Sequence, residues 1–484
     1  MFRTAAILVF AFAASQTAPA PAPPQPSAPA PRPKGKAPVS NEILRVKLPR
    51  PAEADLSNGL HLIVLEDRRL PQISFEIIVP GAGGYFDAPD RFGIAAFTAA
   101  MMREGTTERT SQQIAEQIDS MAAGLTVSAG ASSWSASISG SSLTEHFDRL
   151  LALTADVLLH PTFPQEELDR FKQRTRAGLV QQRSNPQFLA SELYSRVLFG
   201  AHPASRVSPS LESLDKATRD ALIAWHKERY VPDHAAIAVA GDISLEEARR
   251  RLESALAGWK NAGAPKPDVS NPADLTGPRL AMVARPSSVQ TSLYVGTQSV
   301  QRTSPDYPAF VVANRIIGGG ATGRLYSNLR EQKGYTYGAY SGLSAGLYRG
   351  SWQATTDVRT EVTGAALDEI FKEITRLRTE PVPPDELQEA KRAMVASFAL
   401  SLESPETVIG YYITRWQYGL PADYWDKYPE RLMTVTADEV QAVARKYLDA
   451  SRLQVVAVGD AKVGDVLKSR GALEVYDTEG KRIS

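Results

Sequence analysis

The stretch FPQEELDRFKQ, residues 163–173, returns in a closely related form as VPPDELQEAKR, residues 382–392. Aligning Glu167 with Glu386 sets an offset of 219 residues, and the same offset matches other landmarks of the chain. A further segment, AVAGD ending at residue 242, matches VAVGD ending at residue 460 with an offset of 218. Self-similarity in one register over this distance indicates a duplicated domain. The additional landmarks are Pro186 with Pro405 and Gly200 with Gly419.

The repeat divides the chain into two halves of similar pattern. We assign residues 44–257 to the N-terminal half, 258–277 to a linker rich in Pro, Gly and Asn, 278–470 to the C-terminal half and 471–484 to a tail. Each half shows strand-like alternation, then helical periodicity, then a closing apolar run. These segments are 60–79, 166–182 and 235–240 in the first half, and 279–297, 385–402 and 453–458 in the second.

This mixture of elements predicts an α+β fold. Each half should contain a mixed or antiparallel sheet with helices packed on one face. The composition is compatible with such a core, since 43% of the 484 residues are hydrophobic. Basic and acidic residues balance at 54 each, so no bulk charge attracts nucleic acid. The absence of cysteine excludes disulfides, thiolate metal sites and cysteine nucleophiles.

The N-terminus has the pattern of an export signal. Arg3 precedes the apolar run AAILVFAFAA, residues 5–14, which is too short to span a bilayer. We therefore expect residues 1–20 to be a signal peptide and the protein to be periplasmic or secreted. Residues 21–43 are dominated by Pro and Ala and predict an unfolded tether. No cysteine follows the apolar run, so we expect no lipid-linked membrane anchor.

The segment GIAAFTAAMMREGT, residues 93–106, resembles the signature of the pitrilysin/insulinase-type zinc peptidases, whose commonest form is GLAHFLEHMLFKGT. The flanking residues match in register, and the preceding PGAGGYFDAPDRFG resembles the glycine-rich approach to that helix. The resemblance implies two α+β halves that face one another across a substrate chamber.

The metal-binding positions of that signature are occupied by alanine. Family members bind zinc through His-x-x-Glu-His, with both histidines on one helix face and the glutamate activating water. These positions correspond to Ala96, Ala99 and Ala100, and the stretch that holds the third ligand, residues 171–186, contains no carboxylate. No two of the six histidines lie closer than eight residues, so no helical pair of ligands exists. We expect this chain to bind no metal cofactor itself.

A second signature is retained in the C-terminal half. Residues 318–341, GGGATGRLYSNLREQKGYTYGAYS, resemble the family segment that ends in LRE-x-x-G-x-x-Y. The resemblance implies that Arg330 and Tyr337 reach a zinc site from the non-metal half. Arginine offers a planar fork of donors to carbonyl groups, and a tyrosine hydroxyl can stabilise a developing oxyanion. A surface arginine and a strand tyrosine remain the alternative, while Arg324 and Tyr326 are predicted to be structural.

The resemblance implies a division of labour between two chains. In two-chain members, such as the mitochondrial processing peptidase and bacterial heterodimers, one subunit carries zinc and the other carries the arginine–tyrosine pair. This chain is similar to the second kind, which predicts a non-catalytic, substrate-binding subunit acting in trans. The expected partners are a homologous subunit with His-x-x-Glu-His, which holds the zinc, and a peptide or unfolded substrate. A catalytically dead structural or assembly subunit and a peptide-binding protein are the alternatives.

Overall fold

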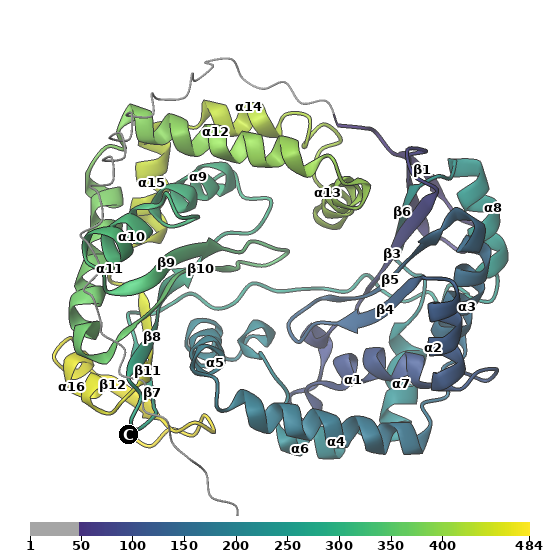
Figure 1. The fold of residues 1–484 in the computed structure, drawn as a ribbon, viewed down its shortest axis with the longest axis horizontal. Helices are drawn as coiled ribbons and strands as arrows, with labels where there is room; N and C mark the ends of the chain where they lie inside the picture. Colours follow the sequence, from purple (N-terminus) through teal and green to yellow (C-terminus); the bar gives the residue numbers. More distant parts are fainter. Residues whose placement is uncertain (1–47) are drawn as a thin grey trace, which may run out of the picture. The chain divides into compact units, whose positions relative to one another are not determined.

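The computed structural model describes residues 48–484, which contain two six-stranded sheets. The predicted signal peptide and tether lie outside the described residues. Of the helices within 48–484, none is both long and apolar enough to cross a lipid bilayer. Figure 1 shows the two sheets with their surrounding helices.

The first half supplies six strands and eight α-helices to the described chain. Its strands are β1 (Ala52–Asp55), β2 (His61–Glu66), β3 (Gln72–Pro80), β4 (Gly124–Ala129), β5 (Ser135–Leu143) and β6 (Ala236–Gly241). Its helices are α1 (Ile94–Met101), α2 (Ser111–Ser120), α3 (Phe147–Leu159), α4 (Gln165–Gln182), α5 (Pro186–Phe199), α6 (Leu211–Lys216), α7 (Arg219–Arg229) and α8 (Leu245–Ala255).

The second half supplies another six strands and eight α-helices. Its strands are β7 (Leu280–Ala284), β8 (Gln290–Gln298), β9 (Thr336–Leu343), β10 (Ser351–Arg359), β11 (Gln454–Gly459) and β12 (Leu473–Tyr476). Its helices are α9 (Tyr307–Ile317), α10 (Arg324–Tyr326), α11 (Thr363–Thr379), α12 (Pro384–Ser401), α13 (Pro405–Tyr418), α14 (Tyr428–Thr434), α15 (Ala437–Tyr447) and α16 (Lys462–Lys468). A π-helix, η6 (Ser327–Gln332), follows α10 directly.

The two halves repeat one another in the register read from the sequence. Both ends of α12 lie 219 residues after those of α4, and both ends of α13 lie 219 residues after those of α5. The sheet orders are β1-β2-β6-β3-β5-β4 and β12-β7-β11-β8-β10-β9, and the last five strands of each correspond one to one. The predicted α+β fold of two homologous halves is therefore confirmed.

The outermost strand differs between the sheets. In the first sheet β1 is antiparallel to β2, whereas in the second sheet β12 is parallel to β7. The residues from 471 onward, which the sequence separated as a tail, therefore include a strand of the second sheet. A four-residue strand carries too little periodicity to be distinguished from a tail before its partner strand is known.

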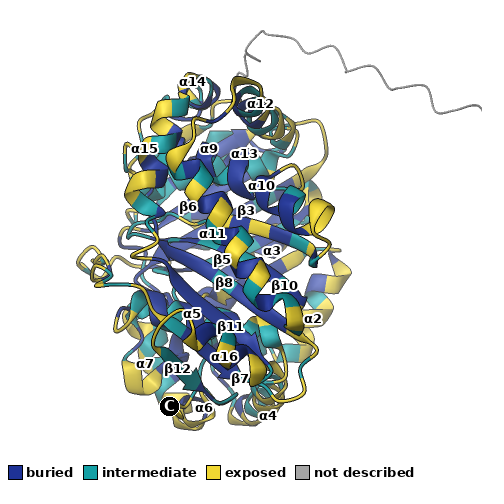
Figure 2. Cartoon of the chain, turned by 90° about the vertical axis from the view of Figure 1, so that its left-hand side faces the viewer, coloured by how far each residue is buried: buried dark blue, intermediate teal, exposed yellow. Residues whose placement is uncertain are grey.

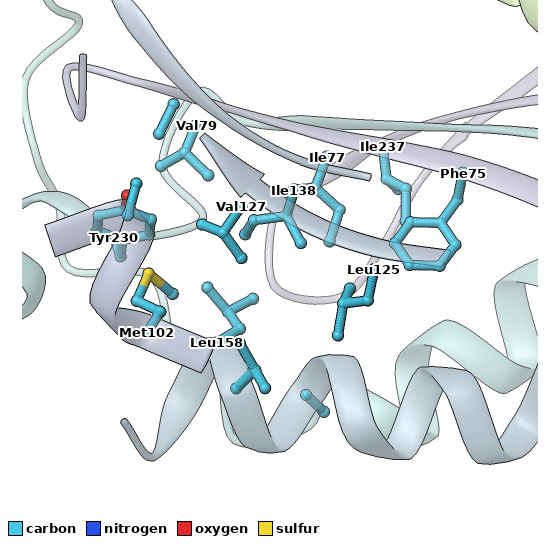
Figure 3. Close-up of a cluster of buried hydrophobic side chains, with 14 of the residues drawn as sticks. Phe75, Ile77, Val79, Met102, Leu125, Val127, Ile138, Leu158, Tyr230 and Ile237 are labelled. Carbon is cyan, nitrogen blue, oxygen red and sulfur yellow. The ribbon is translucent and has the colours of Figure 1, made fainter. Parts of the chain in front are cut away.

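One face of each sheet is covered by helices of the same half. In the first half this core contains alternate residues of β3, β4 and β5, which meet side chains from α3 and from the segment after α1 (Figure 3). Phe75, Ile77 and Ile138 are at most 3% exposed. Burial of an aliphatic or aromatic side chain of this size stabilises the fold by about 1.5–3 kcal/mol. Figure 2 shows β8 and β11 buried in the same way in the second half.

The other face of each sheet is covered by a helix from the opposite half. Helix α5 packs on β7, β8 and β11, and α13 packs on β2 and β6 (Figure 1). Every residue of β6 and of β11 is buried, because both faces of these central strands are covered. The sequence predicted helices packed on one face of each sheet, and in addition a helix from the opposite half covers the second face.

A close contact fixes α5 on the second sheet. The hydroxyl of Tyr194, on α5, donates a 2.9 Å hydrogen bond to the backbone carbonyl oxygen of Trp352. Tyr194 is 2% exposed. A Cβ added at Gly296 of β8 would overlap with that hydroxyl and that carbonyl oxygen. Glycine at position 296 therefore allows α5 to pack closely against the second sheet.

We predict that Gly296→Ala destabilises the protein by about 1–3 kcal/mol, because the added methyl overpacks the seat of Tyr194. Urea unfolding followed by circular dichroism measures the effect. The matched control is Gly342→Ala, in β9 of the same sheet, where a Cβ would meet no atom within 4 Å. Equal stability of the two variants would contradict the close packing of Tyr194 against Gly296.

Candidate functional site

Helix α1, which carries the degenerate metal positions, is held at its N-terminus by Asp87. The two carboxylate oxygens of Asp87 accept hydrogen bonds from the backbone N–H groups of Gly93 at 2.6 Å and Ala95 at 3.1 Å. These N–H groups lack partners within the helix, so a carboxylate satisfies them. Burial of the side chain raises the pKa of Asp87 to about 6, although the two N–H groups oppose this shift.

The three alanines lie as the helical spacing requires. Ala96 and Ala100 are half-buried and stand one turn apart, while Ala99 is 1% exposed. Their methyl groups have no lone pair for a metal and no carboxylate for proton transfer. These residues do not fit a zinc ion.

Helix α4, where the third ligand would lie, packs beside α1. Phe97 and Phe171 meet edge to face with ring centroids 5.7 Å apart. On the same helix, Arg174 lies 3.9 Å from the carboxylate of Glu104. An apolar contact and a cation thus occupy the stretch in which the family places a carboxylate.

The histidines are dispersed. His202, His226 and His234 each pair through Nε2 with a backbone carbonyl oxygen. His61 lies between the carboxylates of Asp55 and Glu53 at the edge of the first sheet. Within residues 48–484 there is no group of three or more His, Asp or Glu side chains arranged to hold a metal ion.

The structure brings Arg330 and Tyr337 together. The guanidinium carbon of Arg330 lies 5.3 Å from the centroid of the Tyr337 ring, which is within cation–π range. Tyr337 is 83% exposed, and Arg330 is also exposed. Within the described chain Arg330 has no carboxylate partner. Its N–H donors and the tyrosine hydroxyl are therefore available to a ligand.

Both residues lie on irregular backbone. Arg330 is in the π-helix η6, where the N–H of Lys333 bonds the carbonyl of Asn328 at 3.0 Å, five residues back. The register of β9 against β10 shifts at Tyr337 and Gly338, which together face Asp357. π-helical turns are rare and are frequent at functional sites, and β-bulges are over-represented at sheet edges and next to active sites, where they redirect a side chain.

Buried groups hold the π-helix in place. Leu329 is fully buried in the core of the second half. The amide nitrogen of Asn328 donates to Glu369 at 2.9 Å and to Glu373 at 2.7 Å, both on α11. The hydrogen bond from Asn328, with smaller contributions from two lysines, lowers the pKa of Glu369 to about 2. These contacts fix one side of η6 and leave Arg330 on the other.

Arg324 and Tyr326 have the structural roles predicted for them. Arg324 begins α10, and its guanidinium makes a bidentate ion pair with Glu386 of α12 at 2.7 and 2.8 Å. The side chain of Arg324 is 8% exposed and that of Glu386 is 33% exposed, so the guanidinium is largely desolvated while the carboxylate still meets solvent. The ring of Tyr326 packs against Tyr340 of β9, with centroids 5.7 Å apart.

Sequence reasoning missed the anchoring residues. Asn328 lies inside the quoted motif, and Glu386 is one of the landmarks that define the repeat. Their position in those segments was the available signal. Asp87 also lies inside a quoted segment, residues 80–93, whereas Glu369 gave no signal, because a bond across 41 residues depends on the tertiary fold.

Each sheet ends in an edge strand, and in the second sheet the N–H of Ser341 on β9 already donates to the carbonyl oxygen of Gly318 at 2.8 Å. Strands β4 and β9 are the outermost strands on equivalent sides of the two sheets. Along β4, exposed and buried residues alternate. An edge strand presents unpaired backbone donors and acceptors to which an extended peptide can add. Tyr337 lies at the start of β9, so its hydroxyl is available beside such an edge.

Two family descriptions match this chain. Insulinase (Peptidase family M16) matches residues 63–207, and Peptidase M16 inactive domain matches residues 216–394. The first matched segment lies within the N-terminal half, and the second runs from residue 216 of that half across the linker into the C-terminal half. They agree with the resemblance inferred from the degenerate and the retained signature.

Relatives and solved structures agree with this match. The chain is 26% identical over 353 residues to an uncharacterized zinc protease, YmxG, of Bacillus subtilis (strain 168), covering 72% of this chain and 83% of that protein. It is 22% identical over 404 residues to a non-peptidase homolog, YmxG, of Helicobacter pylori, covering 83% and 92%. A peptidase M16 inactive domain from Pseudomonas fluorescens superposes with a TM-score of 0.78 at 28% identity, covering 85% of this chain and 98% of that one.

We predict that Asn328→Ala destabilises the protein at pH 7 by about 1.5–3 kcal/mol, because it removes bonds to two carboxylates. The folded pKa of Glu369 lies below its ordinary value of 4.5. Its contribution is thus present above about pH 4.5 and is lost as the pH falls toward 2. Urea unfolding at pH 7 and pH 3 should show the difference between variant and wild type shrinking in acid.

The control is Lys372→Ala, which removes only the exposed 3.1 Å ion pair to Glu369. Exposed pairs contribute about 0–1 kcal/mol. A difference between Asn328→Ala and wild type that stays constant with pH would contradict the role of Glu369.

Proposed function

We infer a function from the family of this chain. The chain belongs to the insulinase family of peptidases, M16. We propose that it is the non-catalytic, substrate-binding subunit of a heteromeric zinc endopeptidase. The partner is a homologous chain with an intact His-x-x-Glu-His motif, and zinc is held there. The substrates are peptides or unfolded proteins, and the complex works outside the cytoplasm.

The observation that carries this proposal is the contrast between two signatures in one chain. Ala96, Ala99 and Ala100 offer no metal ligand. Arg330 and Tyr337 remain stacked on each other and open to solvent. A tyrosine that is 83% exposed buries little apolar area, so packing gives little reason for its position. A ligand between this pair and a second chain supplies such a reason.

The two side chains suit different tasks in peptide binding. Arginine is permanently protonated, and its fork of N–H donors fits carbonyl oxygens of an extended peptide. The hydroxyl of Tyr337 can donate to the oxygen of the scissile carbonyl as that oxygen gains negative charge. The partner's zinc would supply the activated water. In this scheme the chain binds and orients the substrate and stabilises charge, and it transfers no proton.

The sheet edge extends the binding surface. An extended peptide that adds to β9 would gain backbone hydrogen bonds independent of its sequence. The bulge at Tyr337 and Gly338 interrupts regular pairing at the start of that strand. Peptide binding along the edge would therefore end beside the stacked pair.

We predict that Tyr337→Phe lowers kcat of the two-chain complex about 10²–10³-fold, because one donor to the developing oxyanion is removed. Arg330→Ala should instead raise KM most, because it removes donors to the bound peptide. Cleavage of a fluorogenic peptide library by the chain mixed with its metal-bearing homologue measures both. The control for the tyrosine is Tyr340→Phe, another exposed tyrosine of β9. Arg359→Ala, at an exposed ion pair, is the control for the arginine.

Cleavage that is unaffected by both substitutions would remove the role assigned to the pair. Peptide binding without any partner-dependent cleavage would favour a peptide-capturing protein instead. Neither binding nor cleavage with any homologous chain would favour a structural subunit.

We also predict that the purified chain carries far less than one zinc per molecule after dialysis, because alanine occupies the ligand positions. Inductively coupled plasma mass spectrometry of the isolated chain and of the complex makes the comparison. One chelator-sensitive zinc in the isolated chain would contradict the assignment of zinc to the partner.

A further inference from the structure

A cavity of about 470 Å³ opens in the second half between α9 and α12. This volume lies in the range of small-molecule sites, which is about 300–1,000 Å³. Aromatic rings and two arginines line it, and no Asp or Glu does. The lining residues are Arg302, Tyr307, Val311, Asn314, Arg315, Gly319, Ala393, Met394, Ser397, Phe398, Tyr411, Trp425 and Tyr428.

The position of the cavity follows from the repeat. Helix α12 is the counterpart of α4, and α9 follows β8 as α1 follows β3. The helices α9 and α12 pack together, as do α1 and α4. The cavity therefore lies between the second-half counterparts of the two helices that hold the metal site elsewhere in the family. Neither Arg330 nor Tyr337 lines this cavity.

The chemical centre of the cavity is Arg302. This residue is 8% exposed, and its Nε has no hydrogen-bond partner in the described chain. Its guanidinium carbon lies 4.1 Å from the ring centroid of Tyr307 and 5.4 Å from that of Trp425. Within residues 48–484 it forms no ion pair with a carboxylate. The second arginine, Arg315, donates to the backbone carbonyl of Gly319 at 2.7 Å.

A largely buried guanidinium whose Nε has no partner and which lacks an anion, as in Arg302, is costly. Arginine remains protonated in proteins, so it cannot relieve the cost by losing its proton. Cation–π contacts return about 0.5–2 kcal/mol, whereas an unpaired buried charge costs several kcal/mol. An anion entering the cavity would pair with Arg302 and would meet no carboxylate in the lining.

The walls define the rest of the ligand. Phe398, Trp425 and Tyr428 pack against one another, with Phe398 and Trp425 stacked at 6.0 Å. Met394 and Val311 add aliphatic surface. Hydroxyl groups are present on Ser397 and on the tyrosines. A strongly hydrated inorganic ion would leave this apolar and aromatic surface uncovered, whereas a planar apolar group would cover it.

We propose that this cavity binds a carboxylate attached to an aromatic or aliphatic group, with the carboxylate paired to Arg302. The two sources of this chemistry are a free small acid and the C-terminus of a peptide that ends in an apolar residue. The proposal does not depend on the role of Arg330 and Tyr337, since it concerns a separate set of residues.

The test uses the full folded chain and two matched probes. 3-Phenylpropionate carries the carboxylate, and 3-phenylpropionamide has the same shape without the charge. Isothermal titration and quenching of Trp425 fluorescence measure binding, with Trp425→Phe identifying the signal. We expect the acid to bind saturably and the amide to bind at least about tenfold more weakly, as loss of a charge-assisted pair implies. A hexapeptide ending in Phe, with a free or an amidated C-terminus, distinguishes the two sources.

The variants locate the contact. Arg302→Gln should weaken binding of the acid at least about tenfold and leave the amide unchanged, while Arg302→Lys should retain part of the affinity because it keeps the charge. The control is Arg431→Gln. The guanidinium carbons of Arg302 and Arg431 lie 5.4 and 4.7 Å from the ring centroid of Tyr424, yet Arg431 does not line the cavity. If Arg302→Gln fails to fold, the acid–amide comparison on the wild type still decides.

Equal affinity for acid and amide, in both the small probes and the peptides, would overturn the proposal. The proposal would also be overturned if neither the small acid nor the free-carboxyl peptide bound saturably. An equal loss of acid binding in Arg302→Gln and Arg431→Gln would overturn it as well. Binding of the small acid alone supports a small-molecule site. Binding of the free-carboxyl peptide alone supports a site for peptide ends.

Discussion

The two central strands β6 and β11 are apolar on both faces, and one of these faces is covered by a helix of the opposite half. Alternate residues of β6 enter the core of their own half, while Ala238 and Ala240 face α13 of the other half. On β11, Val456 and Val458 face α5 in the same way. Separating the halves would expose these faces to water, at roughly 25 cal/mol for each Å² of apolar surface. The exchange of helices thus makes the two halves one folding unit. It also fixes the polypeptide on either side of the linker without requiring the linker to be rigid.

On this frame, the elements that carry the candidate site are held by buried polar contacts and not by regular secondary structure. Asp87 replaces missing hydrogen bonds at the start of α1, and Asn328 ties η6 to the carboxylates of α11. Burying these polar groups costs desolvation free energy, and their hydrogen bonds offset that cost only in one geometry. The contacts therefore specify position more than they add stability. That is the requirement for η6, which must hold Arg330 over an exposed ring. A regular α-helix and an unbulged strand would meet their hydrogen bonds without this arrangement.

The sequence predicted the duplication well because helix ends are local events. Pro186 and Pro405 each begin a helix at the first position, where the missing N–H is harmless, and the repeat register of α5 and α13 follows. What the sequence could not predict was which sheet each helix covers. The uniform burial of β6 indicates a covered second face, but the periodicity of a strand does not identify the covering element. The cavity around Arg302 escaped for the same reason. Its lining comes from separate segments between residues 302 and 428, and nothing in the local sequence around Arg302 signals a missing carboxylate.

The two signatures differ in what the fold itself requires of them. Alanine is the best helix former, and on α1 three alanines avoid the cost of placing imidazole and carboxylate groups in a partly buried position without a metal. Stability alone therefore accounts for the degenerate helix. It does not account for the second signature. A tyrosine at a bulge on an edge strand buries little surface, and the exposed arginine stacked on it gains at most about 1 kcal/mol from that contact. The fold does not need Arg330 and Tyr337, yet buried contacts such as those of Asn328 hold their backbone in place. This arrangement is expected where a side chain binds a partner outside its own chain.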